Sequence, residues 1–255
     1  MEDKTYFLLD GAMINGIKEF LPQPPQPFSW MRQLVKDEDP GGLYGPVLID
    51  AQAADDLGEL EIAYRLCRAN FTRLHLSYIF TPLNIEELVA HFRQFIMVWL
   101  EDRTTLMLRF ADCRCLPAFS RVLSPGQWRS FMEPISRWEY YTRTGERQAL
   151  PPADKTVEPV PAAWVITLDQ TEAFMDENEP DILLNNLGYS MEDMRGNLQA
   201  YWDTAKQCVT YWQKNDTGNR NVLQAFARKV FEKRGENLHE WGTYFAAAQA
   251  EYGRT

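Results

Sequence analysis

The apolar residues of this 255-residue chain recur with two different periods, and the change between them lies near residue 168. Before that point, short apolar runs such as 6–12 and 45–51 have the length of buried strands, and stretches of helical period separate them. After it, apolar residues recur mainly at steps of three and four. The change predicts an α+β fold. We expect an N-terminal α/β lobe over 1–168, with a mixed sheet flanked by helices, and an all-helical C-terminal lobe over 169–255.

Further strands of the N-terminal lobe are expected where apolar, β-branched and aromatic residues gather. Such runs lie at 74–80, 104–112 and 136–144, and 163–168 would add a short last strand. Within 104–112, the alternation of side chains places Arg109 on the face opposite Leu108 and Phe110. The segment 151–161 contains four prolines and no periodicity, which predicts a loop or linker.

Capping residues mark the expected starts of the helices in this lobe. Asp55 or Asp56 is expected to cap the first helix, and Thr81 followed by Pro82 is expected to open the second. Ser124, with a glutamine three residues later, predicts a capping-box start for a third helix. The inner stripes of the first two helices would consist of Leu57, Leu60, Tyr64 and Cys67, and of Ile85, Leu88, Val89, Phe92, Ile96 and Trp99.

The longest helix of the C-terminal lobe is expected over 190–215, because Ser190 followed by Asp193 has the spacing of a capping box. Two shorter helices are expected around 222–230 and 238–248. The large apolar side chains of this lobe would fill its core or leave some exposed to hold a partner's helix in a groove. The candidate partner-binding residues are Tyr201, Trp202, Trp212 and Trp241.

The charge of the chain argues against several classes of partner. Its net charge is −10 and its pI is about 4.9, whereas a nucleic-acid binder needs a basic face for the phosphates. Anionic lipid would also repel an acidic protein, and the apolar run 95–100 is too short to cross a bilayer. The N-terminal segment does not have the pattern of a signal peptide. We therefore expect a cytoplasmic protein with neither nucleic acid nor membrane as its partner, and its charge suits a basic protein partner.

The four cysteines predict neither disulfides nor a metal site. Cys67, Cys113, Cys115 and Cys208 have no framework of spacings, so they are expected to be reduced thiols. Cys113 and Cys115 resemble half of a zinc site, but a second pair of ligands is missing. No metal and no cofactor is therefore expected.

Candidate catalytic residues also have simpler structural interpretations. Asp10 ends an apolar strand, as the nucleophile of some phosphotransfer enzymes does, but Ala12 occupies the position of the second aspartate that such enzymes need. Asp10 is therefore expected to bond nearby backbone amides. His91 is expected to be tied to a neighbouring carboxylate such as Glu87, and Arg109 to form an ion pair with Asp112 or Asp10.

Several segments of the first half occur in an order typical of one family. They are FLLDGA at 7–12, GPVLI at 45–49, EELVAHFRQF at 86–95, RFADCR at 109–114 and SPGQWRSFMEPISRW at 124–138. Over about residues 6–144, the chain resembles the domain of unknown function 4123, the adaptor or chaperone family of bacterial type VI secretion. The usual proline of its aspartate-proline-arginine step is replaced here by Cys113. The motif residues that the resemblance singles out are Asp10, His91, Arg93, Arg109, Asp112 and Arg114.

The resemblance implies a non-enzymatic protein that binds a toxic effector in the producing cell and helps load it onto the spike protein VgrG. The helical lobe lies outside the family signature, so it is expected to select the effector. Two alternatives stay open at this point. One is an immunity protein that caps a toxin, and the other is an uncharacterised enzyme that uses His91, Arg109 and Asp112.

Overall fold

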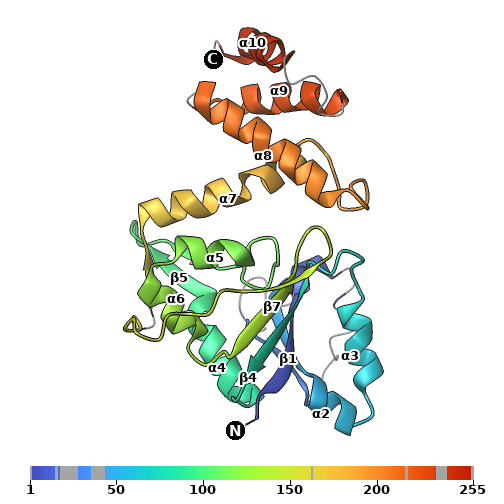
Figure 1. Ribbon diagram of the computed structural model, residues 1–255, viewed down its shortest axis with the longest axis vertical. Helices are drawn as coiled ribbons and strands as arrows, with labels where there is room; N and C mark the ends of the chain where they lie inside the picture. Colours follow the sequence, from blue (N-terminus) through green and yellow to red (C-terminus); the bar gives the residue numbers. More distant parts are fainter. Residues whose placement is uncertain are drawn as a thin grey trace. The chain divides into compact units, whose positions relative to one another are not determined.

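The computed structural model describes residues 2–14, 17, 28–35, 44–161, 163–215, 218–233 and 240–253. The chain divides into two compact units, Met1–Phe174 and Met175–Thr255, and the division falls inside helix α7 (Leu168–Asn186). The first unit combines two sheets with helices and the second is helical, so the fold is α+β, as the sequence predicts (Figure 1).

The larger sheet of the first unit has six strands in the order β2-β3-β1-β4-β7-β8. All neighbouring pairs in it are antiparallel. The central strand β1 carries the apolar run at the start of the chain, and its last five residues are buried. The strands are β1 (Lys4–Asp10), β2 (Met31–Gln33), β3 (Pro46–Asp50), β4 (Leu76–Thr81), β7 (Arg137–Tyr141) and β8 (Arg147–Ala149).

Both faces of this sheet are covered, because its central strands are apolar on both sides. On one face, Phe7 and Leu9 of β1 pack in a core with Leu66 of α3 (Leu60–Cys67). On the other face, Trp138 of β7 packs against Phe92 of α4 (Ile85–Ile96) and Phe131 of α6 (Pro125–Met132). Figure 1 shows α2 (Ala51–Asp56) and α3 beside one face and α4 and α6 beside the other.

The smaller sheet has three strands in the order β6-β5-β9. Its strands are β5 (Met97–Leu100), β6 (Thr105–Met107) and β9 (Val165–Ile166). Strand β6 is antiparallel to β5 and β9 is parallel to it, so the parallel pairing is confined to this small sheet. The strand expected over 104–112 is therefore shorter than predicted, because the chain turns at Phe110 and Arg109 lies after the strand.

Three helices of the first unit, α2, α4 and α6, begin at residues whose side chains cap them, but two of the expected caps are wrong. Asp50 caps α2 through a bond from the backbone N–H of Ala53, and α3 is a separate helix without a side-chain cap. The expected inner stripe is confirmed in part: Cys67 is buried and Leu60 packs against the core, whereas Leu57 and Tyr64 are exposed. The helices are α2 (Ala51–Asp56), α3 (Leu60–Cys67), α4 (Ile85–Ile96), α5 (Leu116–Val122) and α6 (Pro125–Met132).

Helix α4 begins three residues later than predicted. Thr81 belongs to β4, and its hydroxyl donates a hydrogen bond to the Pro134 carbonyl at 2.5 Å. The cap is Asn84, which forms a reciprocal capping box with Glu87. Trp99 is also not on the inner stripe of this helix, because it lies in β5. The capping box that Ser124 and Gln127 form at the start of α6 is confirmed.

The second unit is helical around one apolar core. It contains the last part of α7 together with α8 (Leu198–Asn215), α9 (Arg220–Glu232) and α10 (Trp241–Tyr252). The helix expected over 190–215 is shorter than predicted. Ser190 and Asp193 do form their capping bonds, but Gly196 has a φ of +81° and interrupts the helical backbone before α8 begins. Leu238 and His239 lie outside the described residues.

Candidate functional site

The FLLDGA segment ends in a tight turn that Asp10 and Gly11 make possible. Asp10 caps the 3₁₀ helix η1 (Gly11–Met13) by accepting a hydrogen bond from the backbone N–H of Ala12 at 2.9 Å. A Cβ atom on Gly11 would lie 2.5 Å from the carbonyl oxygen of Gly45, which is closer than such atoms approach. The FLLDGA and GPVLI segments are therefore in contact at a position that only glycine can occupy.

The RFADCR segment forms a turn around Asp112, whose side chain is fully buried. Its Oδ1 accepts hydrogen bonds from the backbone N–H and the Nε–H of Arg114, at 2.9 and 3.0 Å. Its Oδ2 lies 2.7 Å from Nη2 of Arg114 and 3.1 Å from Nη2 of Arg109. The same nitrogen of Arg109 donates to Oδ2 of Asp10 at 2.7 Å. We call these four residues the charged cluster: Asp10, Arg109, Asp112 and Arg114.

The charges of this cluster balance, with two carboxylates and two guanidinium groups. Burial alone would raise the pKa of Asp112, but the hydrogen bonds and charge of Arg114, with the charge of Arg109, hold that pKa below its usual value. Burial raises the pKa of Asp10, and the charge of Arg109 offsets only part of that rise. Both acids have structural partners, and the ion pair expected for Arg109 is present. Its guanidinium is nevertheless not buried, because 46% of the side chain is exposed.

Cys113 attaches the same turn to the start of β4. Its backbone N–H donates to the carbonyl of Leu74 at 2.9 Å, and its Sγ–H donates to the carbonyl of Leu76 at 3.1 Å. Burial raises the pKa of this thiol to about 12, so it is a poor metal ligand near neutral pH. Within the described part of the chain, no group of three or more metal-ligating side chains lies together.

His91 and Arg93 bond to backbone carbonyls. His91 donates from Nε2 to the carbonyl of Phe131 at 2.9 Å, whereas Glu87 is engaged in the capping box of α4, so the predicted His91–Glu87 contact is wrong. Arg93 donates to the carbonyls of Leu34 and Gln33, both at 3.1 Å. These bonds connect α4 to α6 and to the end of β2.

The first unit therefore brings Asp10, Arg109, Asp112 and Arg114 together and gives His91 a different neighbour. Among the described residues, no hydrogen bond or ion pair links His91 to the charged cluster. This arrangement joins segments that are distant in the sequence. The cluster connects the end of β1 to the turn before α5.

Most of the motif segments of the first unit lie within the part of the chain that matches a family model. Residues 5–130 match the family model described as Domain of unknown function (DUF4123). This segment of the chain is a DUF4123 domain. No curated protein and no solved structure matches the chain. The charged cluster, His91 and Arg93 lie within the DUF4123 domain, and the unit Met175–Thr255 lies outside the match.

In the helical unit, the four candidate partner-binding residues have different surroundings. Trp212 and Trp241 belong to the core, with 8% and 5% of each residue exposed. Tyr201 is partly buried and its ring lies 5.8 Å from that of Phe231. Trp202 donates from Nε1 to Asp181 at 3.2 Å. A partner could reach only a small part of Trp212 and Trp241 in this arrangement.

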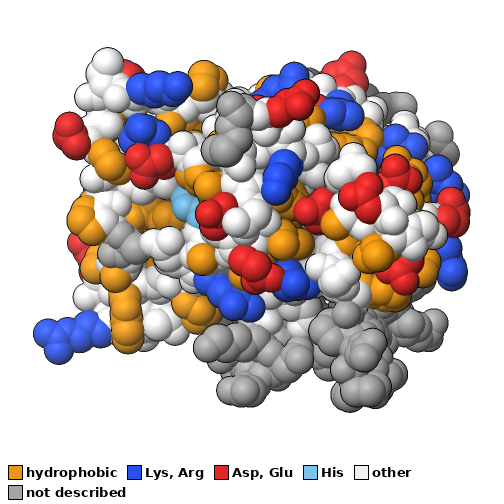
Figure 2. Space-filling model, turned by 90° about the horizontal axis from the view of Figure 1, so that it is seen from below, with side chains coloured by type: hydrophobic (Ala, Val, Ile, Leu, Met, Phe, Trp, Pro, Cys, Tyr) orange, Lys and Arg blue, Asp and Glu red, His pale blue; other side chains and the backbone are white. Residues whose placement is uncertain are grey.

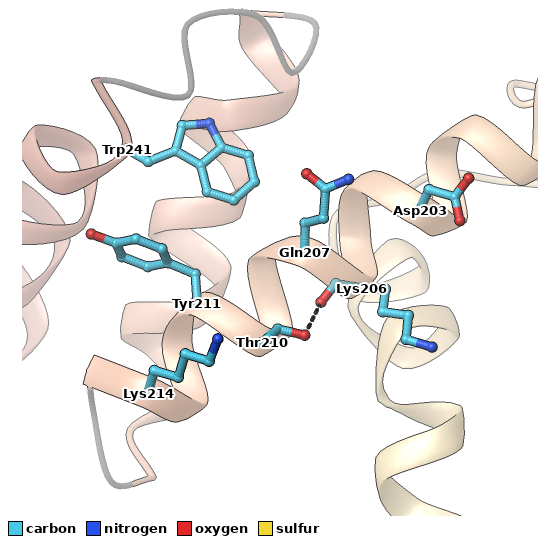
Figure 3. Close-up of a pocket in the computed structure, with 7 residues that line it drawn as sticks. All are labelled: Asp203, Lys206, Gln207, Thr210, Tyr211, Lys214 and Trp241. Atoms are coloured by element: carbon cyan, nitrogen blue, oxygen red, sulfur yellow. Dashed lines mark hydrogen bonds between the residues drawn. The ribbon is translucent and has the colours of Figure 1, made fainter.

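A pocket of about 520 Å³ lies on this unit, between the outer side of α8 and the first residue of α10 (Figure 3). Trp241 contributes one wall beside Tyr211, and the two ring centroids are 6.0 Å apart. The hydroxyl of Thr210 is turned back to the carbonyl of Lys206 at 2.8 Å, so its proton does not point into the pocket. The lining residues are Asp203, Lys206, Gln207, Thr210, Tyr211, Lys214 and Trp241.

The sequence prediction missed the polar residues of this pocket, because it considered only the apolar stripe of the helix. Positions 203, 207, 210 and 214 recur at steps of three and four, with 206 beside 207, so they line one face beside that stripe. Two lysines and an aspartate beside a tryptophan can recognise a polar protein segment that carries an apolar anchor.

The described surface has no extended area of one charge on the face in Figure 2, where basic and acidic side chains alternate. Across the described part of the chain, no helix combines the length and apolar content needed to cross a bilayer.

Proposed function

We propose that the protein is a non-enzymatic adaptor that binds a type VI secretion effector in the cytoplasm and helps load it onto the VgrG spike. The observation that carries this proposal is the DUF4123 domain at 5–130, followed by a separate helical unit outside the match. The DUF4123 domain supplies the resemblance to the adaptor family. The helical unit supplies a second surface for a partner.

The chemistry of the motif residues supports a structural role for them. The carboxylates of Asp10 and Asp112 are held by arginines, and His91 is held by the carbonyl of Phe131. A general base needs hydrogen-bond reach to a substrate, and these groups are engaged within the protein. This arrangement favours the adaptor over an enzyme that uses His91, Arg109 and Asp112.

An immunity protein is the second candidate, since an acidic chain with a net charge of −10 could cap a basic toxin. The two functions differ in what the complex contains. An adaptor forms a complex that includes both effector and VgrG, whereas an immunity protein binds the toxin and blocks its activity. The proposed adaptor is therefore tested by reconstituting both interactions.

The experiment is co-purification of the full chain with the product of the adjacent effector gene, with and without VgrG. The pocket of the helical unit provides a matched pair of variants. Lys206→Ala with Lys214→Ala changes two exposed lysines of the pocket, and Lys229→Ala changes an exposed lysine on α9 outside it. We expect the double variant to lose effector and the control to retain it, with unchanged circular dichroism for both.

Exchange of residues 169–255 with those of a relative that serves another effector should transfer the preference to the new effector. A chimaera that keeps the original effector would contradict the assignment of selectivity to the helical unit. A stable complex with toxin that never includes VgrG, together with loss of toxin activity, would instead favour an immunity protein.

A further inference from the structure

The small sheet β6-β5-β9 has one face in the core and one face in solvent. Val98 of β5 and Ile166 of β9 point inward and are 1% and 0% exposed. Met97 and Trp99 alternate with Val98, so they point outward. Val165 is the register partner of Trp99 on the neighbouring strand and lies on the same outward face.

This outward face is mostly apolar, with Thr105 of β6, the register partner of Trp99, as an exposed polar residue, although the solvent face of a sheet is ordinarily polar throughout. The exposed fractions are 48% for Met97, 49% for Trp99 and 51% for Val165. Leu168, two residues after the end of β9, is the first residue of α7 and is 61% exposed. We call Met97, Trp99, Val165 and Leu168 the apolar face. Exposed apolar side chains that lie together on a surface can mark an interaction site.

One acidic side chain lies beside the apolar face at the end of β5, and two more acidic residues follow Leu168 on α7. The Glu101 carboxylate accepts a hydrogen bond from the backbone N–H of Leu168 at 2.9 Å, which places this charge beside the face. Asp169 follows Leu168 in the chain, and Glu172 lies one helical turn further along α7. Arg103 is a basic residue in the neighbouring turn. We call Glu101, Asp169 and Glu172 the acidic rim.

We propose that the apolar face is a docking surface for an amphipathic helix of another protein, with lysine or arginine at the end of its apolar stripe. A helix packed on a sheet is the standard way to cover an apolar sheet face. The acidic rim provides the complementary charge for the basic end of that helix. A second copy of this chain is a poor occupant, because it would bring the same acidic rim and a net charge of −10.

The side chains of the face suit such a partner. Tryptophan is among the residues that contribute most to binding when it becomes fully desolvated, and half of Trp99 is available to be covered. Methionine adapts its shape to different apolar partners, and Met97 lies next but one to Trp99 along β5. The docking surface belongs to the first unit, so this inference does not depend on the pocket of α8 or on the identity of an effector.

The test uses two synthetic 18-residue helical peptides with the full chain, measured by calorimetry. One carries a leucine stripe with lysines, and the other carries the same stripe with glutamates. We expect the lysine peptide to bind and the glutamate peptide to bind about tenfold more weakly or not at all. Trp99→Ser should weaken binding of the lysine peptide by about tenfold or more.

A matched pair of leucines locates the site. Leu168→Ser changes the apolar face, and Leu57→Ser changes a leucine after α2 that is similarly exposed, at 57% against 61%. We expect only Leu168→Ser to weaken binding of the lysine peptide. Glu101→Gln combined with Asp169→Asn should reduce the difference between the two peptides while the fold is retained.

Several outcomes would overturn the inference. These are equal binding of both peptides, equal effects of Leu168→Ser and Leu57→Ser, or no effect of Trp99→Ser. A concentration-dependent dimer that Trp99→Ser abolishes would assign the face to a second copy of the chain. Binding to phosphatidylglycerol vesicles that the same variant abolishes would assign it to a membrane surface.

Discussion

Asp10 and Arg109 lie 99 positions apart in the sequence, and a 2.7 Å ion pair joins them at the end of β1. The same guanidinium reaches Asp112, which is itself held by Arg114. Two motif segments of the DUF4123 domain thereby meet in one cluster. The charged residues of these segments have a structural role, because their ion pairs hold a turn against the central strand of the sheet.

The members of this cluster should contribute unequally to stability. Asp112→Asn leaves two arginines without their fully buried partner, so we expect the free energy of unfolding to fall by ~3–5 kcal/mol. Arg109→Gln changes a side chain that is 46% exposed, and we expect a loss of about 1 kcal/mol. Urea unfolding followed by circular dichroism measures both. Equal losses, or a larger loss for Arg109→Gln, would contradict the buried position of Asp112.

Gly11 should not tolerate even a methyl group. In Gly11→Ala the new Cβ would meet the Gly45 carbonyl oxygen at 2.5 Å, so the backbone must shift, and we expect a loss of about 2 kcal/mol or more in the free energy of unfolding. Gly242→Ala is the control, because its Cβ would lie 3.6 Å from the Tyr211 hydroxyl inside α10. Alanine in a helix is favourable, so this variant should be neutral or up to about 1 kcal/mol more stable.

The cysteines should differ in their reaction with iodoacetamide near neutral pH. Cys67, Cys113 and Cys208 are buried, and burial raises the pKa of each thiol to about 12. Cys115 is only partly buried. Because the thiolate is the reactive form, Cys115 should be alkylated first in the native protein. Mass spectrometry of the peptides after short exposure measures the order, and early labelling of Cys113 would contradict its placement.

The charge state of His75 should make stability depend on pH. His75 is fully buried, its Nε2 donates to the Leu66 carbonyl, and its Nδ1 has no partner among the described residues. Burial lowers its pKa below the usual value near 6.5. The unfolded chain therefore binds a proton that the folded chain does not accept, so stability is lost as pH falls below about 6.5.

The measurement for this effect is urea unfolding at pH 7.5 and pH 5.5. We expect lower stability at pH 5.5, and His75→Gln should reduce the difference between the two pH values, although the variant itself is less stable. The burial of His91 lowers its pKa as well, so His91→Gln should act in the same direction. An unchanged pH dependence in both variants would contradict this account.

Local signals predicted the central elements of the fold, and tertiary contacts determined the rest. The strand at β1, the capping box of α6 and the irregular segment 151–161 follow from composition and spacing alone. The predicted start of α4 is wrong because Thr81 bonds to the carbonyl of Pro134, 53 residues away, and Asn84 forms the capping box with Glu87 instead. Gly196 was the available signal for the break before α8.

In the candidate site, too, local signals predicted some contacts and tertiary structure determined the others. The sequence placed Asp10 and Asp112 as possible partners of Arg109, and both contacts are present. It could not show that His91 bonds to a carbonyl of α6, because that contact spans 40 residues and involves a backbone atom. The apolar face depends on the register of β5 with β9, which no local pattern specifies.

Substitutions of the two tryptophans of α8 should distinguish a residue of the core from a residue that contacts a partner. Trp212 is 8% exposed, and its Nε1 has no hydrogen-bond partner among the described residues, so it contributes by packing. Trp212→Ala should lower the free energy of unfolding of the helical unit by ~3–5 kcal/mol, and Trp212→Phe by much less, because no hydrogen bond is lost.

Trp202 is the contrasting residue on the same helix. It is partly exposed, its Nε1 donates to Asp181, and the ammonium of Lys206 lies 4.8 Å from the centre of its ring. Trp202→Ala should therefore cost only about 1 kcal/mol of stability, since it removes one polar hydrogen bond and an exposed cation–π contact. Urea unfolding gives the stabilities, and co-purification with the effector gives the binding. If Trp202→Ala keeps the fold and loses the effector, this side chain contacts the partner. If it destabilises the unit as much as Trp212→Ala does, Trp202 acts in the core and the partner must be bound elsewhere on the unit.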